Sequence, residues 1–273
     1  EDIEHIRQIA DRERAPFYVV GETTGDHRFV FEQTDGVKPI DLAMEDMFGK
    51  APRTVMTDRT VEETYEDVTY DQTQLDEYVE RVLQLEAVAC KDWLTNKVDR
   101  SVTGKIARQQ CQGEIQLPLS DCGVVALDYR GRAGIATSIG HAPQAALVDP
   151  AAGSVLSIAE ALTNIVWAPL SEGLDSVSLS ANWMWPCKNE GEDARLYRAV
   201  EACSDFACSL GINIPTGKDS LSMTQKYGKD KVYSPGTVII SAGAEVSDIR
   251  KVVSPVLRTG VDSMVYYIDF SFD

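Results

Sequence analysis

Apolar and polar residues alternate over short stretches in the first part of the chain and at helical intervals further on. Apolar runs at Phe17–Val20 and Phe29–Phe31 lie among glycines and predict small strands joined by turns. A polar, acidic stretch from Asp58 to Asp71 follows and indicates a linker or a solvated surface. We therefore place a domain boundary near residue 57, after the tail of a β-containing domain.

Beyond this boundary, three segments carry apolar residues at the i, i+3, i+4 spacing of an amphipathic helix. Each is preceded by residues typical of a helix start, and the third is followed by Gly211, which suits the left-handed end of a helix. The residue pairs at the starts are Asp71 with Gln74, Asp149 with Pro150, and Asn189 with Glu192, and the apolar stripes are Leu75, Tyr78, Val79, Val82 and Leu83; Val155, Ala159, Leu162 and Val166; and Leu196, Val200, Cys203, Ala207 and Leu210.

Strand-like apolar runs are interspersed with these helices. We expect strands within Leu117–Asp128, at Val177–Ala181 and at Thr237–Val246, and a final strand that begins at Met264. The irregular alternation of helices and strands predicts a mixed α+β fold and argues against a barrel or a helical bundle.

Composition narrows the classes of function. The chain has 273 residues, of which 44% are hydrophobic and 25% charged, and its net charge is −17. It contains no apolar run of the roughly 20 residues that cross a membrane, so we expect a soluble protein. The negative field opposes attraction to nucleic acid or to an anionic membrane. A phosphate-bearing ligand must therefore be held locally or through a cation.

The six cysteines form no CxxC pair and no Cys/His cluster of the kind that holds structural zinc. Cys203 and Cys208 lie on different faces if their segment is a helix. The sequence therefore predicts free, buried thiols in a reducing cytosol, and we expect a cytoplasmic protein. The chain begins without an initiator methionine and ends within an apolar stretch, so we expect it to be a piece of a longer polypeptide.

One polar segment has the residue types that hold phosphate. We expect Ile214–Ser220 to form a loop, in which Gly217, Lys218, Asp219 and Ser220 offer backbone N–H groups, a hydroxyl and a cation. The segment lacks the Walker A spacing. The alternative interpretation is an ordinary turn.

A second pattern is a possible cation site. Glu160 and Asn164 are at i, i+4 on the second predicted helix, so their oxygens could reach one Mg²⁺ that also binds ligand phosphates. The alternative is a solvated polar face of an amphipathic helix.

Other conspicuous residues have structural explanations. Trp183 and Trp185 flank one methionine and are typical of core or lid packing. His141 is expected in a loop, where a single histidine without a partner is usually structural. No Ser/His/Asp or Cys/His set is recognisable in the sequence. The patterns alone therefore predict a mixed α and β domain and leave open whether it binds phosphate.

Several long motifs, in a fixed order, carry a resemblance to a known family. They resemble the large, single-chain phosphoribosylformylglycinamidine synthases of purine biosynthesis, over about Ala10 to Leu257. The motifs are DRSVTG from Asp99, LPLSDCGVVALDYRGRAGIATSIGHAP from Leu117, LVDPAAGSVLSIAEALTNIVWAPL from Leu147, VSLSANWMWPCKNEGEDARLYRAV from Val177, and INIPTGKDSLSM from Ile212.

The resemblance implies a domain organisation. Family members have two halves, each similar to aminoimidazole ribonucleotide synthetase, and a C-terminal glutamine amidotransferase domain. Residues 1–56 would end the C-terminal domain of the first half. Residues 57–258 would form the N-terminal synthetase-like domain of the second half, a mixed sheet with packed helices, and residues 259–273 would begin the next domain. The glutaminase and its nucleophilic cysteine would lie outside this chain.

The resemblance also implies an ATP-dependent carbon–nitrogen ligase activity with glutamine as nitrogen donor. Such an enzyme converts formylglycinamide ribonucleotide, glutamine and ATP to formylglycinamidine ribonucleotide, ADP, phosphate and glutamate. ATP activates the formamide oxygen as an iminophosphate, and ammonia from glutamine displaces the phosphate. Mg²⁺ neutralises the phosphate charges, and the protein positions the reactants.

The family holds a second, structural ADP with magnesium, and its metal ligands match Asp121, Glu160 and Asn164, with Ser120 beside the nucleotide. A further aspartate ligand would follow Asp273. By the pseudo-twofold symmetry of the family, the Gly217–Ser220 segment would face the catalytic site built with the first half and contact phosphate or substrate. The catalytic histidine of the family would lie in that half, so His141 has no such role.

Three alternatives stay open at this point. The chain could be a structural domain that holds ADP and magnesium without turnover, or a pure interaction module. It could also be a relative such as selenophosphate synthetase, although GKDSLSM and SANWM argue against this. We expect the chain alone to form no amidine and to self-associate through a strand-rich apolar face. We also expect Asp121, a costly unpaired carboxylate if it interrupts a buried strand, to converge with Glu160 and Asn164 on one cation.

Overall fold

The computed structural model describes residues 2–50, 52–62, 64–95, 98 and 100–269. The chain divides into two compact units, Glu1–Val55 and Met56–Asp273. The assignment of these units to particular domains of a longer protein stays a prediction.

The first unit contains two helices and a β-hairpin. Helix α1 covers Ile3–Glu13, strands β1 (Arg28–Phe31) and β2 (Ile40–Ala43) pair antiparallel, and helix α2 covers Met44–Phe48. The predicted strand at Phe29–Phe31 is therefore confirmed. The strand predicted at Phe17–Val20 is wrong, because an apolar run forms a strand only where a partner strand pairs with it, and this run has none among the described residues.

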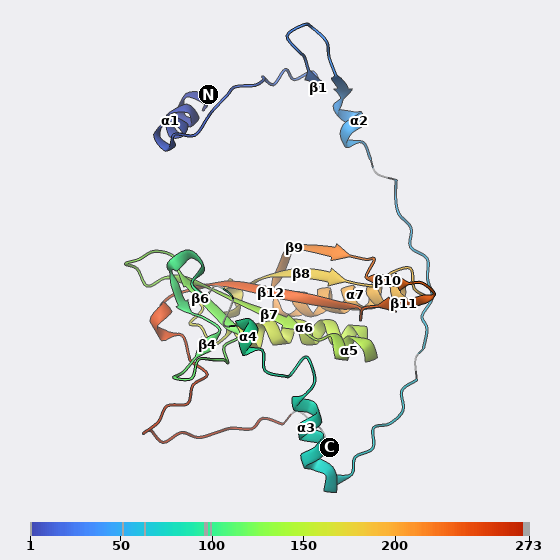
Figure 1. Ribbon diagram of the computed structural model, residues 1–273, viewed down its shortest axis with the longest axis vertical. Coiled ribbons are helices and arrows are strands. Elements are labelled where there is room, and N and C mark those ends of the chain that lie inside the picture. The colour runs from blue at the N-terminus through green and yellow to red at the C-terminus, as the bar shows by residue number, and fades with distance from the viewer. Residues whose placement is uncertain (1, 51, 63, 96–97, 99, 270–273) are drawn as a thin grey trace. The chain divides into compact units, whose positions relative to one another are not determined.

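A six-stranded mixed sheet organises the second unit and confirms the α+β prediction (Figure 1). The strand order is β3-β6-β7-β12-β8-β9, and all neighbours are antiparallel except the parallel pair β8 and β9. The strands are β3 (Ile106–Arg108), β6 (Cys122–Ala126), β7 (Gly134–His141), β8 (Ser178–Met184), β9 (Asn213–Ser220) and β12 (Thr237–Val246), with two small hairpins of β4 (Cys111–Gln112) and β5 (Leu117–Pro118), and of β10 (Thr224–Tyr227) and β11 (Asp230–Tyr233).

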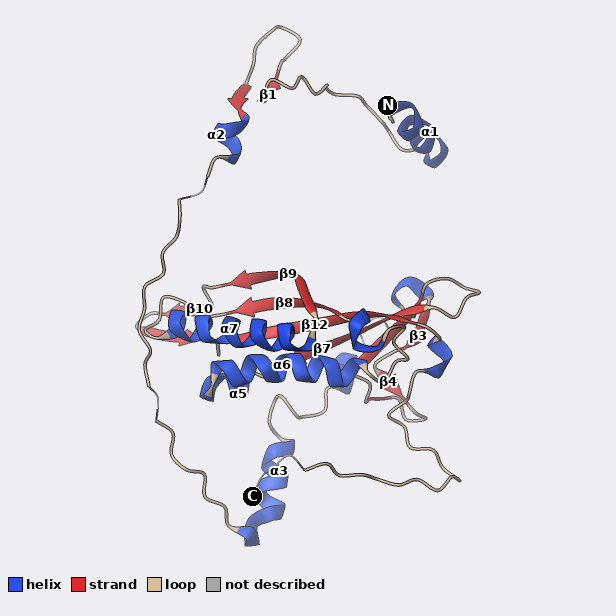
Figure 2. Cartoon of the chain, turned by 180° about the vertical axis from the view of Figure 1, so that it is seen from behind, coloured by secondary structure: helices blue, strands red, loops and turns tan. Residues whose placement is uncertain are grey.

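Helices α5 (Pro143–Val148), α6 (Pro150–Ile165) and α7 (Glu192–Leu210) lie against this sheet, with α6 and α7 side by side (Figure 2). Alternate residues of β7 and β12 are buried beneath them, together with apolar residues of α6 such as Ile158 and Ile165. The short helices are α3 (Leu75–Leu83), α4 (Asp92–Thr95) and 3-10 turns at Gln72–Gln74, Val102–Gly104, Gly173–Ser176 and Ile249–Lys251.

The start of α6 follows the prediction, but its buried face does not. The Asp149 side chain accepts a hydrogen bond from the Ala151 amide, and Pro150 is the first helical residue. In the expected stripe only Leu162 is buried, whereas Ser157, expected on the polar side, is fully buried. The Ser157 hydroxyl donates to the Gly153 carbonyl, so this small polar residue tolerates burial. Small residues allow α6 to approach β7 closely on a face that hydrophobicity does not mark.

The start of α7 also differs from the prediction. The helix begins after Gly191. Because this N-cap residue is a glycine, it has no side chain that could bond to the first amides of the helix. Asn189 instead bonds to the Pro186 carbonyl and the Thr224 hydroxyl, so the predicted capping pair with Glu192 is wrong. The predicted end at Gly211 is confirmed, since this glycine has a φ of 70°.

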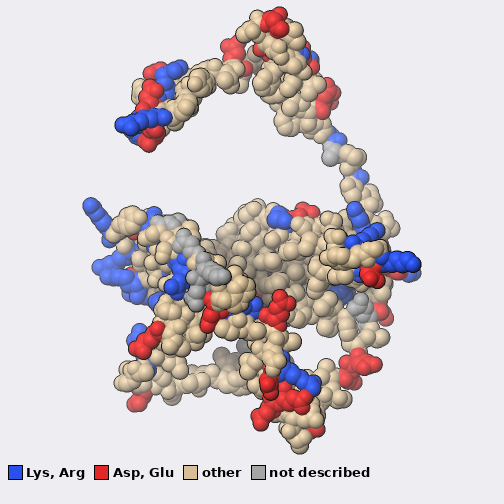
Figure 3. Space-filling model, viewed as in Figure 1, with Lys and Arg blue, Asp and Glu red and all other residues tan. Residues whose placement is uncertain are grey.

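The predicted helix at α3 is present, and the Asp71 side chain accepts from the Thr73 amide just before it. Its apolar stripe is exposed in the described structure except for half-buried Tyr78. Acidic side chains, drawn red, gather at the bottom of Figure 3, where α3 lies in the same view of Figure 1. The strand predicted from Met264 is wrong for residues 264–269, which belong to no strand in the described structure. An apolar run forms a strand only where a partner strand pairs with it. The rest of this predicted strand lies outside the described residues.

All six cysteines are free thiols, as predicted, but the expected burial is wrong for Cys90 and Cys208, which are exposed. Cys203 is buried and Cys208 is not, because the two lie on different faces of α7. Within the described ranges, no helix is both long and apolar enough to span a membrane. Trp185 is fully buried and packs in a small second core with Cys187 and Ala199, which agrees with the structural explanation of the tryptophan pair.

Candidate functional site

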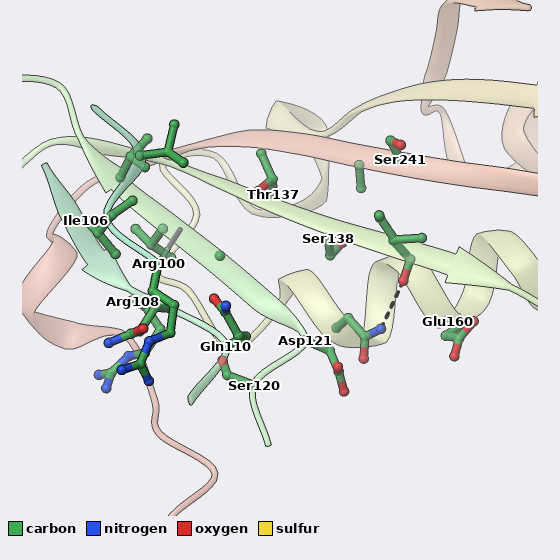
Figure 4. A pocket seen from close by; sticks show the side chains of 18 of the residues that line it. Arg100, Ile106, Arg108, Gln110, Ser120, Asp121, Thr137, Ser138, Glu160 and Ser241 are labelled. Carbon is green, nitrogen blue, oxygen red and sulfur yellow. Dashed lines mark hydrogen bonds between the residues drawn. The ribbon is translucent and has the colours of Figure 1, made fainter. Parts of the chain in front are cut away.

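A pocket of about 870 Å³ lies where strands β3, β6, β7 and β12 meet helix α6 (Figure 4). The predicted site residues Ser120, Asp121, Glu160 and Asn164 all line it. The structure therefore brings together residues that are up to 44 positions apart in the chain. Their roles as nucleotide and metal ligands stay predictions.

Asp121 lies in the short connection between β5 and β6, directly before the buried strand residue Cys122. Its carboxylate is exposed, so the expected cost of a buried, unpaired charge does not arise. The connection is held by the Ser120 amide, which donates to the Gln110 carbonyl at 3.1 Å, and by the Ser120 hydroxyl, which donates to the Cys122 carbonyl at 3.2 Å. Asp121 is thus an accessible carboxylate on a fixed backbone.

Glu160 and Asn164 lie one turn apart on α6 and are both bound to the end of β7. The Glu160 carboxylate accepts from the His141 amide, and Asn164 Nδ2 donates to the Ile139 carbonyl at 3.0 Å, which is the dashed line in Figure 4. The Asn164 amide nitrogen is therefore occupied, and its oxygen is the atom suited to bind a cation. His141 is the last residue of strand β7, so the prediction that it lies in a loop is wrong.

Asp121 and Asn164 also line a second pocket of about 370 Å³. Its other walls are mainly apolar: Leu119, Cys122, Trp167, Val253, Pro255 and Leu257, together with Ser120 and Ser254. Ser120, Asp121 and Asn164 thus lie between a large pocket that also holds Glu160 and two arginines and a smaller, mainly apolar one. This arrangement suits a ligand with a charged part and an aromatic or apolar part.

The three predicted ligands supply two carboxylates and one amide, all hard oxygen donors that suit Mg²⁺. Among the described residues there is no group of three or more His, Cys, Asp or Glu side chains that could hold a metal by itself. A cation at Asp121, Glu160 and Asn164 would therefore need further oxygen ligands. Phosphate groups and water are the usual ones for Mg²⁺.

Two arginines at the other end of the large pocket were not predicted. Figure 4 shows Arg100 and Arg108 grouped near Gln110, away from Glu160. Arg108 donates to Gln112 Oε1 and to the Val252 carbonyl, both at 2.9 Å. Only the pairing of β3 with β6 brings these residues to the pocket, so no sequence spacing could have identified them. Figure 3 shows that Lys and Arg gather at this end of the second unit despite the negative net charge.

The Gly217–Ser220 segment forms a strand, which corrects the loop prediction. It is the end of β9, the edge strand that pairs parallel with β8. A Cβ at Gly217 would lie 2.3 Å from the Ala181 carbonyl oxygen, so glycine permits the two strands to pair here. The long-range pairing overrides the local turn preference of the Gly-Lys-Asp sequence.

Gly217, Lys218 and Asp219 line a separate pocket of about 400 Å³ together with Trp183. Lys218 Nζ donates to the Ser220 hydroxyl at 2.8 Å, which aligns the two polar side chains along the strand. This pocket shares no lining residue with the large one. The described structure thus separates the two predicted groups of site residues into two places.

Comparisons with known proteins agree with the resemblance. The family model described as FGAR-AT PurM_N-like domain matches residues 90–245. Phosphoribosylformylglycinamidine synthases of Dictyostelium discoideum and Homo sapiens are 36% and 39% identical over 98% and 93% of this chain. The chain spans about a fifth of the length of these relatives.

Solved structures share the fold at low sequence identity. Thermotoga maritima PurL complexed with ATP is 15% identical, with a TM-score of 0.57 over 93% of this chain and 37% of that chain. The PurLQS structure of the same organism is 13% identical, with a TM-score of 0.57 over 93% of this chain and 38% of that chain.

Proposed function

Because the chain belongs to the FGAR-AT PurM_N-like domain family, we propose that it is the central part of a phosphoribosylformylglycinamidine synthase. In this proposal, residues 57–258 are the second synthetase-like domain, residues 1–56 end the preceding domain, and residues 259–273 begin the next. The relatives that match nearly the whole chain carry this name, which supports the proposal. The family match also removes the selenophosphate synthetase alternative.

The whole enzyme would use ATP, glutamine and formylglycinamide ribonucleotide to make formylglycinamidine ribonucleotide in purine biosynthesis. We propose that it works in the cytoplasm. This chain would contribute two of its sites. Gly217, Lys218 and Asp219, which line the separate pocket of about 400 Å³, and Ser220, which is bonded to Lys218, would contact phosphate or substrate in the catalytic site. The Lys218 ammonium offers a positive charge to an anionic group there.

The large pocket would hold ADP or ATP with Mg²⁺. The observation that carries this proposal is the common location of Ser120, Asp121, Glu160 and Asn164 on one pocket. Asp121, Glu160 and the Asn164 oxygen would hold the cation, and Ser120 would lie beside the nucleotide. Bound Mg²⁺ neutralises phosphate charge, which a protein with a net charge of −17 otherwise repels.

Nucleotide binding in the intact protein tests this assignment. We expect Glu160→Gln and Asp121→Asn each to weaken Mg²⁺-dependent ADP binding at least about tenfold in calorimetry, since each removes a charged cation ligand. Glu172→Gln is the matched control, because Glu172 is exposed and lines none of the pockets described above. Unchanged ADP affinity in both site variants would overturn the assignment.

A Lys218→Ala variant separates the two proposed sites. We expect it to lower amidine formation while ADP binding at the large pocket stays the same, because the two pockets share no residue. We also expect the 273-residue chain alone, supplied with ATP, ammonia and substrate, to form no amidine. Product from the isolated chain would show that it holds a complete catalytic site, contrary to the proposal.

A partner would cover the face of the sheet opposite the helices. On β7, Ile135 and Ile139 are 41% and 58% exposed, whereas Ala136 and Ser138 between them are buried. We propose that the other synthetase-like domain covers this face in the full enzyme and that a second copy covers it in the isolated chain. Sedimentation velocity should then show concentration-dependent dimers, and a strict monomer at micromolar concentration would contradict this.

A further inference from the structure

A segment at the start of the second unit, residues 56–62, crosses the N-terminal end of helix α7, which begins 130 positions later. The Asp58 carboxylate accepts hydrogen bonds from three backbone amides there: Gly191 at 3.2 Å, Asp193 at 3.0 Å and Ala194 at 3.3 Å. The first amides of a helix have no partner within the helix. Asp58 therefore supplies from a distance the cap that the α7 sequence lacks.

Neighbouring side chains attach the same segment to the residues around Gly191. Arg59 Nε donates to Glu190 Oε1 at 3.1 Å. The Val61 side chain lies over Gly191, where an added Cβ would come within 2.9 Å of it. The hydrogen bonds of Asp58 also hold the pKa of its carboxyl below the ordinary value, first through the Arg59 amide and then through the α7 amides. The hydrogen bonds of Asp58, the hydrogen bond of Arg59 to Glu190 and the contact of Val61 with Gly191 together fix residues 58–61 against the start of α7.

The residues around Gly191 that this segment contacts are in turn joined by hydrogen bonds to residues at and just after the end of strand β9. Residues 185–191 lead from β8 into α7, and the Trp185 amide donates to the Ser220 carbonyl at 2.9 Å. Asn189 Nδ2 donates to the Thr224 hydroxyl at 3.1 Å. Trp185 is fully buried and packs with Cys187 of the same segment and with Ala199 of α7. Residues 185–194 are therefore bound on one side by residues 58–61 and on the other by Ser220 and Thr224.

We propose that residues 56–62 act as a strap that orders residues 185–194 and, through them, the end of β9 that carries Lys218 and Ser220. The strap binds through Asp58, and its release frees the first turn of α7. Asp58 is a positioning residue in this scheme and contacts no ligand. This coupling of residues 56–62 to residues 185–194 does not depend on what the pocket at Lys218 binds.

Hydrogen–deuterium exchange on the intact protein tests the strap, with Asp58→Ala as the variant. We expect at least about tenfold faster exchange in peptides covering residues 190–196, since three amides lose their acceptor. We also expect faster exchange in peptides covering residues 183–189, because the Trp185 amide depends on the same order. Asp67→Ala is the matched control. Asp67 is an exposed carboxylate of the same acidic stretch and makes no hydrogen bond among the described residues.

The β7 and β12 peptides give an internal reference. Their exchange should not change, whereas equal acceleration there would mean general destabilisation and would overturn a local strap. Unchanged exchange at 190–196 would show that Asp58 is not the cap, and faster exchange at 190–196 with none at 183–189 would exclude the coupling. Asp58→Asn, which keeps one oxygen acceptor, should give an intermediate effect and provides the same test if the alanine variant does not fold.

Discussion

Replacing Gly140 by alanine should force strand β7 and helix α6 apart at the edge of the candidate nucleotide pocket. An added Cβ would lie 1.9 Å from the Ser157 carbonyl oxygen and 2.5 Å from the Ala161 nitrogen. Both atoms belong to the helix backbone, so neither can rotate away as a side chain would. Ordinary van der Waals contact begins at 3.4 Å, whereas the Cβ would lie 1.9 Å from the carbonyl oxygen. The strand and the helix must therefore move apart by roughly 1.5 Å.

Such a separation has a large energetic consequence. Overpacking a core typically costs about 1–3 kcal/mol and occasionally more. We expect the upper end here, because the added Cβ meets helix backbone, which no change of rotamer can move away. Fully buried Ile158 and Ile165 lie on the same helix and would lose contacts as it shifts. We therefore expect Gly140→Ala to lower the free energy of unfolding by at least about 3 kcal/mol. The Glu160 bond to the His141 amide, next to Gly140, should weaken as well.

Urea denaturation followed by circular dichroism measures this change. The matched control is Gly243→Ala on the adjacent strand β12, where an added Cβ meets no atom within 4 Å. We expect the control to change stability by less than about 1 kcal/mol. If the two variants had equal midpoints and slopes, the close approach at Gly140 would not limit packing, and the reasoning would be refuted.

Three further predictions concern single residues. Burial raises the pKa of Cys203 to about 11, so iodoacetamide at pH 8 should modify exposed Cys208 and leave Cys203 intact until the protein unfolds; mass spectrometry showing equal rates would contradict this. The Arg250 side chain holds the pKa of Asp248 below its usual 3.8, so Asp248 stabilises the fold above that pH and loses this effect as the pH falls further. The melting temperature of Asp248→Asn should therefore lie below that of the unchanged protein at pH 6, and a gap that does not shrink below pH 4 would exclude this origin. Asp149→Ala should cost about 1 kcal/mol by removing the α6 cap, and an unchanged thermal midpoint would show that the cap contributes nothing.

Features that depend on neighbouring residues could be predicted from the sequence. Asp149 and Pro150 define the start of α6, and Gly211 defines the end of α7, because capping groups and backbone conformation act within one helical turn. The β12 prediction at Thr237–Val246 was also correct, since its run of apolar and small residues suits a strand, and the residues that alternate along it are buried beneath the helices.

The candidate site was predictable only in part. Glu160 and Asn164 share a helical face by their spacing, but their common pocket with Asp121 was expected from the family resemblance and not from any local rule. Arg100 and Arg108 escaped prediction, because only the pairing of β3 with β6 brings them to that pocket.

The sequence by itself therefore determined the α+β class, the helices α3, α6 and α7, the strands β6, β8 and β12, and the chemical types of the site residues. The tertiary structure decided that Gly217–Ser220 is a strand, because its partner β8 lies more than thirty positions away. It also decided which face of α6 is buried and that Asp58 caps α7. In each case the deciding atoms are distant in the chain, and local preferences are weaker than the hydrogen bonds and close packing that the fold adds.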